Sequence, residues 1–231
     1  MKSIYFSAAV FTAALAMAGG ANAATTFATQ IDAGRAGVAG AGFEATSPVF
    51  NTSRDDAGNA LGARDVVSDT DGGFYSLGRG NADDSLNTGV AVFGFGTSFG
   101  LEATVFEVTF GCSGATGGSG SCGNFAEFAT VYAFNGPYTP FDNTFTVADL
   151  LGLGFSEVGT IGNGDANSAS GATISIAGPF TFLAIADASN QGADGFDIDA
   201  VSVNAVPLPA SILFLLGGIG GLGFMRMRRT A

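Results

Sequence analysis

Short apolar segments separated by glycine set the strongest limit on what this chain can fold into. Of its 231 residues, 37 are glycine, and they divide the second half of the chain into brief stretches rich in β-branched and aromatic side chains. Alternation of apolar and polar residues within such stretches is typical of strands. We expect strands at residues 25–31, 90–95, 102–110, 127–134, 156–161, 173–176, 180–186 and 196–203.

The order of these segments predicts the fold class. The expected strands follow one another without the regular strand–helix alternation of a parallel sheet, which favours an all-β, jelly-roll-like β-sandwich. Residues 146–153 are ambiguous and could form a helical turn. Residues 24–71 are rich in Ala, Gly, Asp and Ser, so we expect mainly irregular structure there and a core within residues 74–203.

Charge and residue usage exclude several functions. The chain has no histidine, which excludes Ser-His-Asp and Cys-His catalysis and a His-based zinc site. All 20 acidic residues lie between Asp32 and Asp199, where four arginines accompany them, giving this part a net charge of −16. Because binding to phosphates depends on Lys and Arg, we expect no nucleic-acid partner.

The first 23 residues have the three parts of a secretory signal peptide. Lys2 supplies a positive start, residues 4–17 form an apolar core, and residues 21–23 form an Ala-x-Ala cleavage site. We therefore predict cleavage between Ala23 and Ala24 and export of the rest of the chain. The alternative is an uncleaved membrane anchor, which the short apolar run disfavours.

The last 26 residues combine a proline motif, an apolar run over residues 211–225 and a basic cluster. Fifteen helical residues span about 22 Å, less than the roughly 30 Å hydrocarbon core of a bilayer, and five glycines weaken the run further. The terminal arginines are expected to remain cytoplasmic. The motif is Val206, Pro207, Leu208, Pro209 and Ala210, and the basic cluster is Arg226, Arg228 and Arg229.

This tail resembles the VPLPA variant of the PEP-CTERM sorting signal. The resemblance implies that an exosortase-type membrane enzyme cuts at the motif and that the protein reaches the cell surface or the medium. It also implies a setting of exopolysaccharide production in Gram-negative bacteria. Leu208 replaces the glutamate of the commoner form, which leaves open which sorting enzyme is used. The expected parts are a signal peptide at residues 1–23, an exported body at 24–205 and a sorting tail at 206–231.

The two cysteines, Cys112 and Cys122, enclose nine residues that are mostly Gly and Ser. In an exported protein such a pair is expected to form a disulfide. Closing a loop of about ten residues contributes about 2–3 kcal/mol to stability in the chain-entropy model. A redox-active pair is the alternative, but the spacing is not Cys-x-x-Cys and no basic neighbour lowers a thiol pKa.

The densest group of acidic residues closes the predicted body. Asp194, Asp197 and Asp199 lie within six residues, and Asp187 ends the strand before them. Asp197 and Asp199 share a face if their strand is regular. Together with Glu107, these carboxylates have the ligand chemistry of a Ca²⁺ site. The alternative is a solvated acidic edge in which aspartates form turns.

Three motifs of the body resemble a largely uncharacterised family of exported bacterial β-sandwich proteins. They are Ser-Leu-Gly at residues 76–78, Val-Phe-Glu at 105–107 and Gly-Phe-Asp-Ile-Asp-Ala-Val at 195–201. The resemblance covers residues 74–203 and implies a β-sandwich.

These features predict a non-enzymatic surface or matrix protein with a structural or adhesive role in exopolysaccharide or biofilm, in which Ca²⁺ could bridge acidic edges to anionic polymer. The first alternative is a carbohydrate-binding module, with Tyr75, Tyr132 and Tyr138 lining a sugar-binding face unless they fill the core. The second is a secreted glycoside hydrolase, which needs paired carboxylates. Glu102 and Glu107 face opposite sides of a regular strand, so they do not form such a pair by themselves.

Overall fold

The structure is a computed structural model that describes residues 23–34, 56–65, 73–78, 89–108, 127–141, 145–163, 170–189 and 195–206. The chain divides into two units. One is Thr25–Ala205, and the other consists of Met1–Ala24 and Val206–Ala231. Of the second unit only Ala23, Ala24 and Val206 are described, so the account below concerns Thr25–Ala205.

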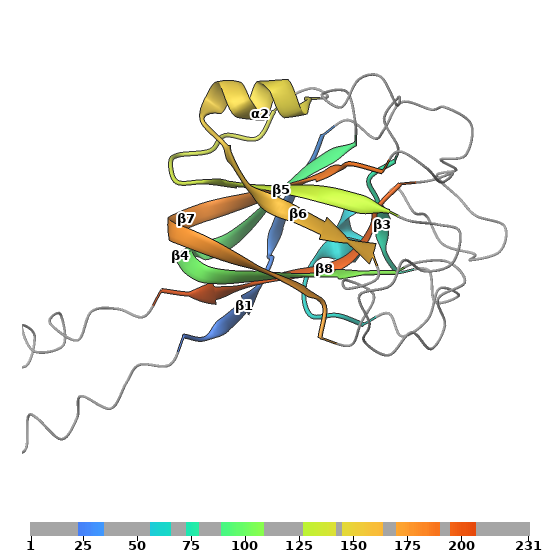
Figure 1. Ribbon diagram of the computed structural model, residues 1–231, viewed down its shortest axis with the longest axis horizontal. Helices are drawn as coiled ribbons and strands as arrows, with labels where there is room; N and C mark the ends of the chain where they lie inside the picture. Colours follow the sequence, from blue (N-terminus) through green and yellow to red (C-terminus); the bar gives the residue numbers. More distant parts are fainter. Residues whose placement is uncertain are drawn as a thin grey trace, which may run out of the picture. The chain divides into compact units, whose positions relative to one another are not determined.

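Antiparallel strands dominate this unit, which confirms the prediction of an all-β fold (Figure 1). The sheet has eight strands in the order β1-β8-β4-β7-β5-β6, while β2 pairs with β4 and β3 pairs with β8. The elements are β1 (Thr25–Phe27), β2 (Gln30–Ala33), the 3₁₀ helix η1 (Ala57–Ala60), β3 (Tyr75–Ser76), β4 (Val90–Glu107), β5 (Phe128–Phe134), α2 (Val147–Leu153), β6 (Ser156–Gly162), β7 (Ala172–Asp187) and β8 (Asp197–Ala205).

Two strands are much longer than the sequence pattern predicts. β4 joins the segments expected at 90–95 and 102–110, and β7 joins those expected at 173–176 and 180–186. The glycines between the segments do not end the strands but bend them. The register of the β4–β7 pair shifts between Gly94 and Phe99 and again between Phe99 and Leu101, and Gly96 has a φ of 66°. Such β-bulges bend the strand that carries them.

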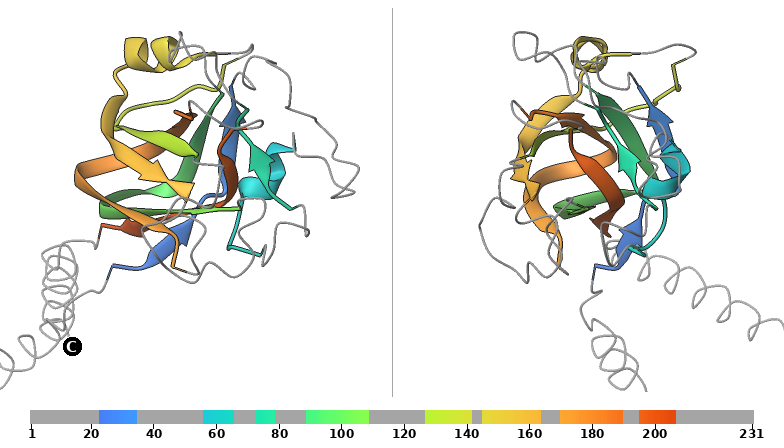
Figure 2. Two further views of the ribbon diagram at one scale, coloured as in Figure 1. Left: turned by 45° about the vertical axis from the view of Figure 1, so that its right-hand side comes forward. Right: turned by 90° about the vertical axis from the view of Figure 1, so that its right-hand side faces the viewer.

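The bend folds the β4–β7 ribbon back on itself, and Figure 1 shows both strands turning at the same side of the molecule. The first half of β4 pairs with β2 and with the second half of β7. The second half of β4 pairs with β8 and with the first half of β7. A single hydrogen-bonded sheet therefore curls around an interior, which Figure 2 shows from two further sides.

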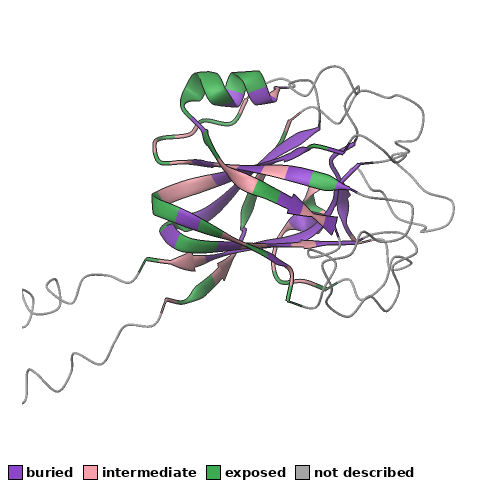
Figure 3. Ribbon diagram, in the orientation of Figure 1, coloured by how far each residue is buried: buried purple, intermediate pink, exposed green. Residues whose placement is uncertain are grey.

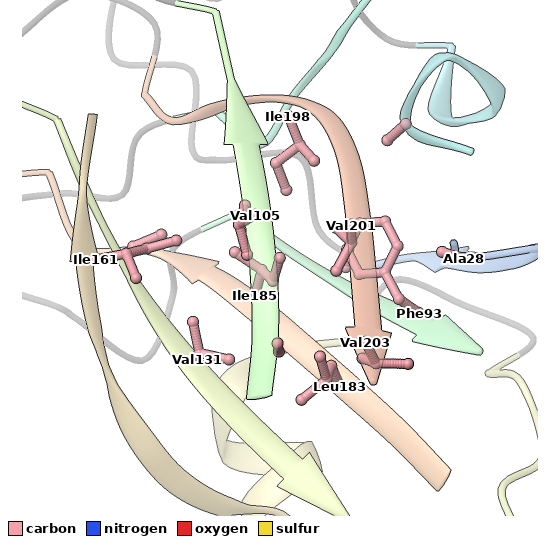
Figure 4. Close-up of a cluster of buried hydrophobic side chains, with 14 of the residues drawn as sticks. Ala28, Phe93, Val105, Val131, Ile161, Leu183, Ile185, Ile198, Val201 and Val203 are labelled. Carbon is pink, nitrogen blue, oxygen red and sulfur yellow. The ribbon is translucent and has the colours of Figure 1, made fainter. Parts of the chain in front are cut away.

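The interior of the curl holds the main hydrophobic core. Aliphatic side chains from β4, β5, β7 and β8 meet there, with Phe93 and Leu183 fully buried (Figure 4). Figure 3 shows burial along both bent strands, interrupted by exposed residues at their bend. A second, smaller core lies on the outer face, where Val92 of β4 and Ala184 of β7 are in one cluster with Leu150 of α2.

The ambiguous segment at residues 146–153 forms α2, which confirms the helical alternative. The Thr146 side chain accepts a hydrogen bond from the Asp149 N–H, and the Asp149 carboxylate accepts one from the Thr146 N–H at 2.8 Å, which is a capping box. The Thr146 N–H and then the Thr146 hydroxyl, which both donate to this carboxylate, hold the pKa of Asp149 below its usual value. No helix in the part of the chain that the structure describes is long and apolar enough to cross a bilayer.

Gly171 precedes β7 at a point where no side chain fits. Its φ is 68°, and a Cβ there would lie 2.7 Å from Thr104 Cγ2 and 2.8 Å from the Val105 carbonyl oxygen. We expect Gly171→Ala to lower the free energy of unfolding by about 2–4 kcal/mol, from left-handed strain and overpacking. Chemical denaturation measures the change.

The matched control is Gly152→Ala on α2. A Cβ at Gly152 meets nothing within 4 Å, and alanine favours helix over glycine. The control should therefore be neutral or stabilising by up to about 1 kcal/mol. Equal losses in both variants would contradict the steric account of Gly171.

Candidate functional site

Five buried carboxylates lie at strand ends that the folded ribbon brings together. We call these residues the acidic end. All are at most 4% exposed, and they include all but one of the metal-ligand candidates from the sequence. The members are Glu107 at the end of β4, Glu127 before β5, Asp187 at the end of β7, and Asp197 and Asp199 in β8.

Backbone hydrogen bonds show that both ends of the bent ribbon meet at residues 196 and 197. The Phe196 N–H donates to Asp187 Oδ1 at the end of β7, at 3.1 Å. The next residue, Asp197, accepts at its carbonyl oxygen from the N–H of Val108, just after β4, also at 3.1 Å. The segment that opens β8 therefore connects the two ends, which lie far apart along an unbent ribbon.

Asp187 joins several neighbouring segments by hydrogen bonds. Besides the bond from Phe196, its Oδ1 accepts a 2.6 Å hydrogen bond from the Ser189 hydroxyl, whose oxygen in turn accepts from the Phe128 N–H at 3.1 Å. The Asp187 N–H donates to the Gly89 carbonyl at 2.9 Å. Asp187 therefore links the end of β7 to the residue before β8 and, through Ser189, to the start of β5. These hydrogen bonds offset the cost of burying the carboxylate.

Asp199 holds a different segment. Its Oδ2 lies 3.5 Å from Arg64 Nε, and its Oδ1 accepts a long bond of 3.4 Å from the Asp65 N–H. The Arg64 guanidinium also lies 6.0 Å from the centre of the Phe106 ring. Asp199 thereby fastens the chain just after η1 to the sheet.

The expected common face of Asp197 and Asp199 depended on a regular strand, and β8 is not regular there. Phe106 pairs with Ala200 while Glu107 pairs with Ile198, so Asp199 is the extra residue of a β-bulge. The side-chain alternation shifts at this point, because the main core takes Ile198 before the bulge and Val201 after it. The bulge redirects one carboxylate toward Arg64, which sequence spacing does not reveal.

Four of the five predicted calcium ligands lie among the described residues. Glu107, Asp187, Asp197 and Asp199 are all buried, and Asp194 lies outside the described residues. Within the described ranges, no group of three or more Cys, Asp or Glu residues is arranged to hold a metal ion. The calcium site stays a prediction, and Asp187 and Asp199 already have the structural hydrogen bonds described above.

Of the residues predicted for processing and for the disulfide, only some lie among the described residues. Ala23 and Ala24 at the predicted cleavage site are described, and Ala24 is exposed. Val206 is 43% exposed, while the rest of the sorting motif and the basic cluster lie outside the described residues. Cys112 and Cys122 also lie outside them, so the disulfide stays a prediction.

The three tyrosines proposed for a sugar-binding face do not form an exposed platform. Tyr75 is 3% exposed and belongs to the main core, while Tyr132 and Tyr138 are half-buried beside the outer core. Burial, and then the hydrogen bond from its hydroxyl to Asp32, raise the pKa of Tyr138 above its usual 10.0. Among the described large hydrophobic residues that are exposed, only Phe128 is aromatic.

Comparison with known proteins gives little. No protein-family model matches the chain, and no curated protein matches it. Among solved structures, the chain is similar to one described as truncated AlyQ with CBM32 and alginate lyase domains, at 8% identity and a TM-score of 0.38. That alignment covers 81% of this chain and 35% of the other, so the chain spans about a third of that protein's length.

The ion pair between Arg64 and Asp199 predicts that Asp199→Asn destabilises the fold. The substitution removes the negative partner of Arg64, and we expect the free energy of unfolding to fall by about 2 kcal/mol, because the Arg64 side chain is 25% exposed and can regain water. Urea denaturation measures the loss. The matched control is Glu157→Gln on the exposed edge of β6, which should stay within about 0.5 kcal/mol of the parent. A similar small change for Asp199→Asn would rule out the anchoring role.

Calorimetry tests the predicted calcium site directly. Heat of binding on Ca²⁺ titration, together with a melting temperature that EDTA lowers, would support a site at the acidic end, because a ligand that binds only the folded state stabilises it. Absence of heat, with a melting temperature unchanged by EDTA, would refute it.

Proposed function

We propose that the chain is an exported surface or matrix protein, processed at both ends, with a structural or adhesive role in exopolysaccharide or biofilm. Its partners are an exosortase-type sorting enzyme, the inner membrane transiently, and exopolysaccharide. It binds and does not catalyse. The first alternative is a carbohydrate-binding module, and the second is a secreted glycoside hydrolase.

The pairing of the first strand of the body, β1, with its last strand, β8, carries this proposal. Thr25 in β1 is the register partner of Asn204 in β8. β1 begins two residues after Ala23, and β8 ends at Ala205, one residue before the sorting motif. Cleavage at the two predicted sites therefore removes no residue of the described sheet, as expected for a body that remains folded after both steps.

The two expected processing sites adjoin this pair of strands in the sequence. Partner Cα atoms in an antiparallel pair lie about 4.5–5.5 Å apart, and each residue adds at most about 3.6 Å of reach. The first residue after the signal peptide and the first of the sorting motif are therefore near neighbours. An export signal and a membrane-arrested tail can then both engage the bilayer without disrupting the sheet.

The use of the buried carboxylates supports binding over catalysis. A glycoside hydrolase needs one carboxyl group that donates a proton and a second that attacks or activates water. Asp187 is held by Ser189 and the Phe196 N–H, and Asp199 is held by Arg64 and the Asp65 N–H. These contacts favour a structural role for both residues.

We further propose that the curled sheet is a variant of the jelly-roll-like β-sandwich.

Intact mass spectrometry of the protein recovered from its own cells tests the proposal. The expected chain begins at Ala24, ends within residues 206–210 and is two hydrogens lighter than the reduced form. Extra mass at the new C-terminus would identify an attached lipid or glycan. A chain that still ends at Ala231 would contradict sorting.

A pair of proline variants sharpens this test. Pro207→Ala combined with Pro209→Ala alters the motif and should leave residues 211–231 attached. Pro179→Ala, at the exposed bend of β7, is the matched control and should be processed normally. Equal processing of both variants would show that the motif is not recognised.

A further inference from the structure

A hollow of about 400 Å³ opens beside the bend of β4 and β7. It is lined by Gln30 of β2, by residues 96–98 at the bend of β4, by Gly136, and by Thr181 and Phe182 of β7. The β4–β7 pairing stops at Gly94 and resumes at Phe99, so residues 95–98 lie outside it, and the exposed residues 96–98 form one wall. The bulge that curls the sheet therefore also creates the hollow.

One row of residues across three strands forms a second wall. Gln30 pairs with Gly94, and Gly94 pairs with Phe182. A Cβ on Gly94 would lie 3.0 Å from Gln30 Oε1 and 3.3 Å from Phe182 Cε1, so the amide and the ring lean over the glycine from both sides. The missing side chain of Gly94 is what allows an amide and an aromatic ring to meet at this place.

The ring of Phe182 packs against the ring of Tyr138. Its centre lies 5.1 Å from the centre of the Tyr138 ring. The Tyr138 hydroxyl donates to Asp32 Oδ2, which also accepts from the Phe141 N–H at 3.1 Å. The Thr181 hydroxyl donates to the Phe134 carbonyl at 3.3 Å, which ties the segment before Gly136 to β7. The half-buried ring is therefore held in place before any ligand arrives, which lowers the entropic cost of binding.

The chemistry of the lining selects the ligand. It presents one aromatic ring, one amide, three hydroxyl groups and backbone at two glycines, and none of its side chains is ionisable. An anionic ligand finds no cationic side chain in this lining, and a metal ion finds no carboxylate. The fitting ligand is uncharged, rich in hydroxyl groups and apolar on one face, because a few polar groups around an apolar surface fix the orientation of such a molecule.

We propose that this hollow binds one sugar unit of a neutral polysaccharide, with the ring of Phe182 against its apolar face. Gln30, Thr97 and Ser98 exchange hydrogen bonds with its hydroxyl groups. The inference deepens the proposed function, on which it rests for the presence of polysaccharide, by naming an uncharged glycan as the polymer recognised. It assigns glycan binding to the bend of the sheet and not to the acidic end.

The test is a titration of the intact protein, purified from its own cells, with cellohexaose, mannohexaose and maltohexaose at millimolar concentrations. Saturation-transfer NMR detects binding, and calorimetry gives the affinity. Trigalacturonate serves as the charged comparison. We expect at least one neutral hexasaccharide to bind, and trigalacturonate to bind more weakly than that hexasaccharide.

Three variants locate the binding. Gln30→Ala should weaken it about fivefold, the value of one neutral hydrogen bond. Gly94→Ala should weaken it further, because the new methyl group separates the amide from the ring, while Gly152→Ala should leave it unchanged. Melting curves of all three establish that the fold is kept.

Three results would overturn the inference. They are binding of none of the neutral hexasaccharides, binding of trigalacturonate alone, and binding that neither Gln30→Ala nor Gly94→Ala weakens. Because the titration does not depend on processing and the mass measurement does not depend on a glycan, this inference and the proposed function can fail separately.

Discussion

The bend in the β4–β7 ribbon is the constraint on which the rest of this structure depends. Two strands of 18 and 16 residues would form a long, flat ribbon that cannot enclose a core. The β-bulge around residues 94–101 folds them back, so that one hydrogen-bonded sheet supplies both walls of the interior. It also carries Leu101 with a φ of 80°, a strained conformation for a leucine that the surrounding pairs maintain.

The same fold-back explains why acidic residues are buried in so lightly charged a chain. The ends of four strands converge, and their exposed backbone N–H groups need acceptors. The Asp187 carboxylate accepts from the Phe196 N–H just before β8, and the Asp199 carboxylate accepts from the Asp65 N–H after η1, with the positive charge of Arg64 beside it. The charge of these residues is therefore part of how the sheet is closed.

Strand positions were predictable from the sequence because local alternation decides them. Residues 127–134 and 156–161 match β5 and β6 within a residue. The sequence did not predict that two expected strands would join to form β4 and two others to form β7. A glycine between two apolar segments is compatible both with the end of a strand and with a bend in a continuous strand. The bulge at Asp199 and the row of Gln30, Gly94 and Phe182 depend on pairing between distant strands, which no local pattern contains. Both tyrosines beside the outer core were named from sequence, but the phenylalanine that lines the hollow was not.

The pairing of β1 with the end of β8 also bears on how such a body would carry mechanical load. A protein held at its C-terminal end transmits force through β8, and this strand pairs with β1, β3 and β4. Pulling along β8 must then slide it against all three neighbours at once and break many bonds together. Pulling residues 25 and 205 apart would instead open β1 from β8 one pair at a time. An attachment through the C-terminal end alone would use the stronger direction of the sheet.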